Sequence, residues 1–152
     1  MADFVNISEA ASLGLHAMTY LASQNGGHRT TASIATVLDV SEHHLAKVMQ
    51  RLAKAELVES VRGPHGGFRL AKDATQITLL DVFEAVEGKA EPRRCLLSIE
   101  PRCPEEKCIL GGLNIRIFKE VREHFQKTKL ADVATVFGEH HHENNKADHP
   151  HR

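Results

Sequence analysis

A glycine-rich break between two short alternating segments is the feature that most constrains the fold of this chain. Apolar and polar residues alternate over 57–62 and again over 68–71, and the run Gly63-Pro64-His65-Gly66-Gly67 separates them. Alternation is typical of a half-buried strand, and glycine with proline stops regular structure. The sequence therefore predicts a β-hairpin with a glycine-rich tip.

The segments before the hairpin have the spacing of amphipathic helices. Helices are expected over residues 8–24, 31–38 and 41–55. Their expected N-caps are hydroxyl side chains: Ser8, Thr30 or Thr31, and Ser41. The third helix has its apolar stripe at Leu45, Val48, Met49 and Leu52. Helix, helix, turn, helix and hairpin is the order of a winged helix-turn-helix module.

The segments after the hairpin complete a mainly α fold. We expect a short helix over 81–87, a loop over 89–110 that contains three prolines, a long amphipathic helix over 112–127, and a short helix over 131–137. The predicted organisation is a winged helix-turn-helix domain at 1–88, a cysteine-rich loop at 89–111, a dimerisation helix with a short C-terminal helix at 112–138, and a tail at 139–152. The tail is polar and holds five of the eleven histidines, so we expect it to be disordered, either a solvated tail or an appended expression sequence.

Composition excludes several classes of function. The chain of 152 residues is 41% apolar and 26% charged, which is typical of a globular protein. Its apolar stretches are too short for a transmembrane helix and no signal-peptide core precedes them, so we expect a cytoplasmic protein with no membrane partner. We find no nucleophile–base pair, phosphate loop or paired carboxylates, and expect no enzyme activity.

Charge is unevenly distributed along the chain. The net charge is −1, yet residues 28–72 carry seven basic against four acidic side chains, a net +3. A helix fits the major groove of DNA and presents its N-terminal side chains to base edges, while a wing arginine can enter the minor groove. The candidate DNA-binding residues are Thr31, Ser41, His43, His44, Lys47, Arg51, Arg62, His65 and Gly66. The alternatives are a solvated basic face, or a winged helix that binds protein and no DNA.

Three cysteines form a second candidate site. Cys95, Cys103 and Cys108 have the spacing C-x7-C-x4-C, and they lie in the predicted loop. Thiolates are soft ligands that suit zinc or iron–sulfur clusters. The spacing alone therefore leaves zinc, an iron–sulfur cluster, free thiols and a thiol redox switch open.

Three stretches resemble one family. The run from Leu57 to Ala71, with its Arg-Gly-Pro-His-Gly-Gly-Phe segment, is similar to the wing of the IscR/NsrR-type winged-helix regulators of the Rrf-two superfamily. The opening helix from Ile7 to Ala22 and the segment from Leu79 to Gly88 resemble the same family, so the resemblance spans roughly residues 7–137. It implies a homodimeric transcription regulator that binds a pseudo-palindromic operator, with the long helix packed against its twin.

The resemblance also implies a role for the cysteines. Sensor members of the family hold a [2Fe–2S] or [4Fe–4S] cluster through three cysteines in this loop, which assigns Cys95, Cys103 and Cys108 as ligands. Some relatives place a histidine three residues after the last cysteine, where this chain has Gly111. For the fourth ligand we prefer His16, with Glu9 second, and a small molecule or hydroxide as a further alternative. The implied signal is redox state, nitric oxide or iron–sulfur status. The alternative within the same fold is a zinc- or thiol-based redox repressor.

Overall fold

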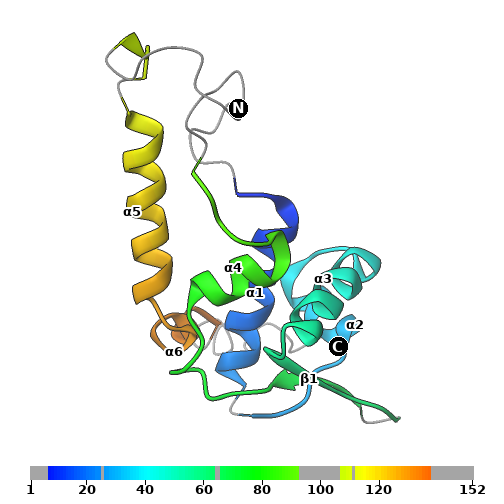
Figure 1. The fold of residues 1–152 in the computed structure, drawn as a ribbon. Helices are drawn as coiled ribbons and strands as arrows, with labels where there is room; N and C mark the ends of the chain where they lie inside the picture. Colours follow the sequence, from blue (N-terminus) through cyan, green and yellow to red (C-terminus); the bar gives the residue numbers. More distant parts are fainter. Residues whose placement is uncertain (1–6, 25, 64–65, 93–106, 111, 138–152) are drawn as a thin grey trace, which may run out of the picture.

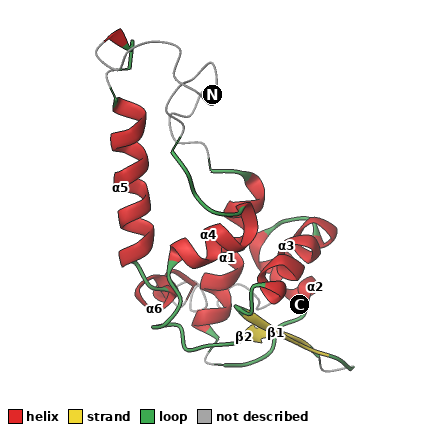
Figure 2. Cartoon of the chain, in the orientation of Figure 1, coloured by secondary structure: helices red, strands yellow, loops and turns green. Residues whose placement is uncertain are grey.

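Helices form most of the described part of the chain, which comprises residues 7–24, 26–63, 66–92, 107–110 and 112–137 of a computed structural model (Figures 1 and 2). The elements in chain order are α1 Glu9–Ser23, α2 Thr31–Leu38, α3 Glu42–Lys54, β1 Val58–Val61, β2 Gly67–Leu70, α4 Leu79–Glu87, α5 Leu113–Lys127, α6 Leu130–Val133 and the 3-10 helix η2 Ala134–Phe137. This confirms the predicted mainly α class with a hairpin. Residues 139–152, predicted to be disordered, lie outside the described residues.

Hydroxyl side chains begin the first three helices, as the sequence predicts. Ser8 accepts a hydrogen bond from the N–H of Ala11 at 3.0 Å, and Ser41 accepts one from the N–H of His44 at 3.4 Å. Thr30, rather than Thr31, caps α2. Each cap satisfies an N–H group that has no partner inside its helix.

Helix α4 begins two residues before the predicted start at Asp81. A reciprocal capping box explains the difference: the N–H of Asp81 donates to Thr78 Oγ1 at 2.9 Å, and the N–H of Thr78 donates to Asp81 Oδ2 at 2.8 Å. A threonine followed three residues later by an acid favours a helix start at the residue after the threonine, so α4 begins at Leu79.

The core lies where α1, α3 and α4 meet. The predicted stripe of α3 is confirmed, because its four apolar residues are all buried. The largest fully buried side chains are Met18, Ile34, Leu45, Met49, Leu52, Ile77, Leu130, Val48 and Val82. Helices α1 and α4 approach closely at Gly14, where an added Cβ would lie 2.9 Å from Val86 Cγ2.

The hairpin pairs Val58 with Leu70 and Val61 with Gly67 in antiparallel register. A segment outside the hairpin pairs with β2, since Arg29 and Phe68 exchange two backbone hydrogen bonds of 2.9 and 2.8 Å. Gly67 has a φ of +146°, and a Cβ there would lie 2.5 Å from the carbonyl oxygen of Arg29. The close approach of another strand therefore requires glycine at this position.

The chain after α5 returns to the first helix. Leu130 is fully buried, its N–H donates to the carbonyl of Ile77, and the N–H of Leu79 donates to the carbonyl of Thr128. Phe137 packs edge-on against Tyr20, with ring centroids 5.6 Å apart. The short helix predicted at 131–137 is present as α6 and η2, and both pack against α1.

Helix α5 confirms the predicted long helix and stands at the side of the molecule (Figure 1). None of its residues is buried. Phe125 contacts Phe83 of α4, with ring centroids 5.8 Å apart, whereas Leu113 at the opposite end is 43% exposed. Among the described residues, no helix combines the length and apolar character needed to cross a membrane.

Candidate DNA interface and metal ligands

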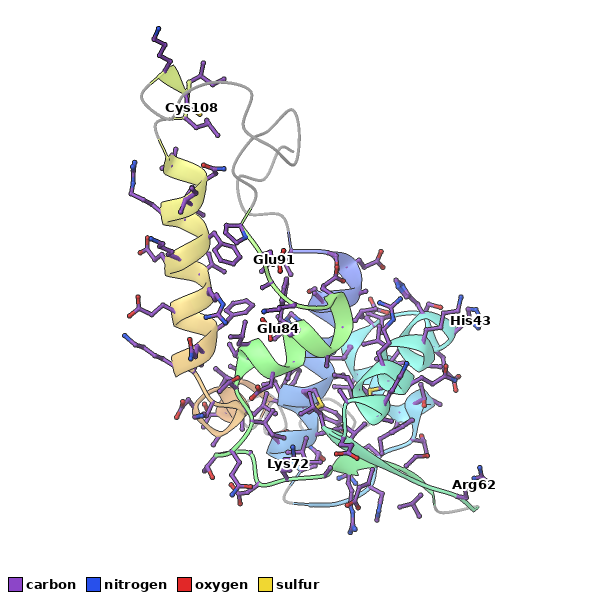
Figure 3. All side chains as sticks on the ribbon, in the orientation of Figure 1. His43, Arg62, Lys72, Glu84, Glu91 and Cys108 are labelled. Carbon is purple, nitrogen blue, oxygen red and sulfur yellow. The ribbon has the colours of Figure 1, made fainter. Side chains whose placement is uncertain are left out.

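The N-cap and the first two turns of α3 present polar side chains to solvent. Ser41, His43 and Lys47 are exposed, while the apolar stripe of the same helix faces the core. Figure 3 shows His43 and Arg62 on the same side of the molecule, opposite α5. This arrangement leaves the start of α3 free to enter a groove, as the sequence predicts for a recognition helix.

His44 differs from His43 in having a partner. Its Nδ1 lies 3.4 Å from Glu9 Oε1 on α1, and the side chain of His44 is 39% exposed against 81% for Glu9. Sequence spacing gives no sign of this contact, because the two residues are 35 positions apart. Glu9, the second choice as a metal ligand, thus lies beside the recognition helix.

The hairpin carries Arg62 at its exposed end, next to Gly63. Across the strands, Arg69 donates through Nε and Nη2 to Glu59 Oε2 at 2.8 and 2.7 Å, so these two charges are paired. A Cβ at Gly66 would lie 2.1 Å from the carbonyl oxygen of Val61, so the fold of the hairpin requires glycine at this position whether or not Gly66 contacts DNA. His65 lies outside the described residues.

Helix α2 offers a phosphate contact through its first turn. Thr31 is half-exposed there, where backbone N–H groups lack intrahelical partners. Helix N-termini of this kind bind anions through those N–H groups and the helix dipole. The predicted contact at Thr31 is therefore compatible with its position.

Arg51 has a partner that the sequence did not reveal. Its Nη1 donates to the carbonyl oxygen of Val86 at 2.9 Å, near the C-terminal end of α4. Arg51 is exposed, and Val86 is one of the three residues that α4 buries against the core. The guanidinium predicted to contact DNA is thus engaged by a neighbouring helix.

One of the three predicted cysteine ligands can be placed. Cys108 is half-exposed and is a free thiol, in the segment that precedes α5 (Figure 3). Cys95 and Cys103 lie outside the described residues. Within the described ranges no group of three or more metal-binding side chains comes together.

His16 has a geometry suited to metal binding. It is exposed on α1, and its Nδ1 lies 2.7 Å from the carbonyl oxygen of Ser12. A carbonyl only accepts, so Nδ1 donates to it, and in a neutral ring Nε2 then keeps its lone pair. Metal-binding histidines commonly donate their other ring nitrogen to a backbone carbonyl in this way.

Comparison with known proteins extends these observations. The chain matches the family Rrf2, described as an iron-dependent transcriptional regulator, over residues 7–135. The regulator CymR of Bacillus subtilis is 35% identical over 132 residues, which cover 86% of this chain and 91% of that protein. The regulator BadM of Rhodopseudomonas palustris is 39% identical over 83 residues, or 55% of this chain and 53% of that protein.

Solved structures similar to this chain are also regulators. The structure of CymR, the global cysteine regulator of B. subtilis, has a TM-score of 0.73 at 34% identity and covers 88% of this chain and 98% of its own. The structure of T. potens IscR has a TM-score of 0.67 at 24% identity, covering 96% and 95%, and shares the fold. These named relatives are regulators, in agreement with the expectation that the chain is not an enzyme.

Proposed function

This chain belongs to the Rrf2 family of transcriptional regulators, and from that membership we propose that it is a cytoplasmic homodimer whose affinity for an operator depends on an iron–sulfur cluster. The family membership supports regulation of transcription through a DNA-binding winged helix. The homodimer, the iron–sulfur cluster and the signal that the cluster senses go beyond the family membership and are our proposal.

The DNA contacts that we propose follow from exposure and charge. His43 and Lys47 at the exposed start of α3 read base edges in the major groove, and Arg62 at the end of the hairpin enters the minor groove. Thr31 at the first turn of α2 binds a phosphate. Ser41, His44, His65 and Gly66 stay predicted contacts.

The apolar residues of α5 support a dimer. No residue of the 15 in helix α5 is fully buried within this chain. Of its six large apolar side chains, Leu113 is exposed and five are only half-buried: Ile115, Ile117, Phe118, Val121 and Phe125. Two copies packed through this helix cover the apolar face and place two recognition helices about a two-fold axis. A pseudo-palindromic operator has the matching symmetry.

The donor set supports a cluster. Three thiolates from Cys95, Cys103 and Cys108, with His16 Nε2 as the fourth ligand, make the mixed sulfur and nitrogen set that an iron–sulfur cluster accepts. In Figure 1, residues 107–110 lie beyond the start of α5 and apart from α1. We therefore assign the fourth ligand to His16 of the second copy. When bound, the cluster supplies a redox-active centre that reacts with oxygen or nitric oxide.

One observation carries this proposal: a single chain joins an exposed recognition helix to three soft ligands within fourteen residues. The test is anaerobic purification, followed by an absorption spectrum, an iron and sulfide count, and operator affinity of the loaded and metal-free protein at fixed salt. We expect a brown protein whose affinity changes on cluster loss. The Cys95→Ser, Cys103→Ser, Cys108→Ser triple variant should be iron-free and behave as the metal-free form. A colourless wild type whose affinity equals that of the triple variant overturns the sensing role.

A second candidate is a thiol-based regulator without a cluster. The relative CymR is described as the global cysteine regulator of B. subtilis, and a Staphylococcus aureus CymR has been solved in an oxidized form at 30% identity and a TM-score of 0.68. Cys108, half-exposed and free, is compatible with such chemistry. Iron-free protein whose operator affinity changes with oxidant, and recovers with reductant, would favour this candidate.

A further inference from the structure

The C-terminal end of α4 is held by two other helices. Arg51 of α3 donates to the carbonyl oxygen of Val86 at 2.9 Å, and the Ser8 hydroxyl at the start of α1 donates to Glu87 Oε1 at 2.6 Å. On α4 itself, Glu84 Oε1 accepts a hydrogen bond from the N–H of Ala90 at 3.2 Å. We call the contacts of Ser8 and Arg51 with Val86 and Glu87 the α4 junction.

The contact at Arg51 satisfies a group that its own helix leaves open. The last four carbonyls of a helix lack intrahelical partners, and a cation near them interacts favourably with the helix dipole. Val86 also packs tightly on its other side, because an added Cβ at Gly14 would lie 2.9 Å from Val86 Cγ2. Helix α3 therefore cannot shift relative to α4 without breaking a charged hydrogen bond.

We propose that Arg51 is a positioning residue: it fixes the recognition helix against the end of α4 and makes no phosphate contact. Arg51 is exposed on α3, as Lys47 is, but its Nη1 donates to the carbonyl oxygen of Val86, which holds the guanidinium at the end of α4. The chain continues from the α4 junction through residues 88–92 to Cys95, three positions after Pro92. A further step rests on the proposed function: the hydrogen bond from Arg51 to Val86 transmits a change at the cysteines from α4 to α3.

The salt dependence of operator binding separates positioning from phosphate contact. Each phosphate contact contributes about 0.9 to the slope of log K against log salt concentration. We expect Arg51→Met to lower operator affinity roughly tenfold, the lower range for a hydrogen bond to a charged group, with the wild-type slope. Lys54→Met is the matched control, because Lys54 is an exposed cation on the same helix and has no hydrogen bond or ion pair among the described residues.

Two results would overturn the positioning role. The first is a slope for Arg51→Met that falls by the amount one lost phosphate contact gives. The second is an affinity for Arg51→Met equal to that of Lys54→Met. Circular dichroism checks that each variant is folded. Should Arg51→Met not fold, Arg51→Lys keeps the charge and shortens the donor: weakened binding with the wild-type slope supports the proposal, and wild-type affinity overturns it.

A second measurement tests the link to the cysteines. The ratio of operator affinities of cluster-loaded and metal-free protein should move toward 1 in Arg51→Met and keep the wild-type value in Lys54→Met. If the ratio in Arg51→Met equals that of the wild-type protein, the link to the cysteines is wrong. If the ratio in the wild-type protein is itself 1, the cluster switch of the proposed function is wrong, and the salt slope still decides the role of Arg51.

Discussion

Helices α1 and α5 have the same length, 15 residues each, and opposite relations to the core. Eight residues of α1 are buried, and none of α5 is. The first helix contacts α3, α4 and the C-terminal segment, whereas α5 meets the rest of the chain mainly through α4 (Figure 1). Both helices have an amphipathic pattern, and this pair illustrates that the pattern does not say how much of the apolar face the same chain will cover.

The largest effect should come from the buried helix. Met18 is fully buried, and Met18→Ala should lower the free energy of unfolding by about 2–5 kcal/mol through lost burial and the cavity left behind. Urea denaturation followed by circular dichroism measures the change. The matched variant on α5 is Leu113→Ala, where the side chain is 43% exposed, and its cost in dilute, monomeric protein should be much smaller. Equal costs would remove the contrast between the helices.

A charge on the apolar face of α5 should act on assembly rather than on folding. We expect Leu113→Asp to raise the dimer dissociation constant about 30-fold or more, because it places a charge in the apolar contact proposed between the two copies. Sedimentation measures the oligomeric state, and operator affinity should fall with it. Gln126→Asp adds the same charge at an exposed polar position of α5 and should leave assembly unchanged. A Leu113→Asp protein that remains dimeric would place the interface elsewhere.

The smallest effect should come from the solvent face of α5. Glu123 accepts a hydrogen bond from Lys127, and this bond together with the charge of Lys127 lowers the pKa of Glu123 below its usual 4.5. A lowered pKa in the folded state gives a stabilisation that is present above pH 4.5 and is lost as pH falls through the folded-state pKa. Because the pair is exposed, Glu123→Gln should change the thermal midpoint at pH 7 by little. A midpoint that drops as far as in Met18→Ala would contradict a solvated face.

Local chemistry made much of the fold predictable. Ser8 and Ser41 were expected as caps because each precedes an apolar period, and the stripe of Leu45, Val48, Met49 and Leu52 follows from helical spacing alone. The start of α4 was also predictable, because Thr78 and Asp81 have the spacing of a capping box.

Contacts between distant segments were not predictable. The bond from Arg51 to Val86 spans 35 positions, the pair of Glu9 and His44 another 35, and nothing in either local pattern marks them. Leu130 belongs to a segment of four helical residues, too short for its period to indicate a partner. Of the proposed site, exposure of His43 and Lys47 follows from the helical pattern. Strand alternation does not give the exposure of Arg62, because β1 buries only Val58, and the engagement of Arg51 needs the tertiary structure.

The backbone bonds of Thr128 and Leu130 to Leu79 and Ile77 fix the C-terminal end of α5 as a pivot. At a rise of about 1.5 Å per residue, 15 residues make a lever of about 22 Å, so a tilt of about 10° displaces the far end by roughly 4 Å. Cys108 lies just beyond that far end. A tilt of α5 about its C-terminal end would therefore move the segment that carries Cys108 farther than any part of the helix itself.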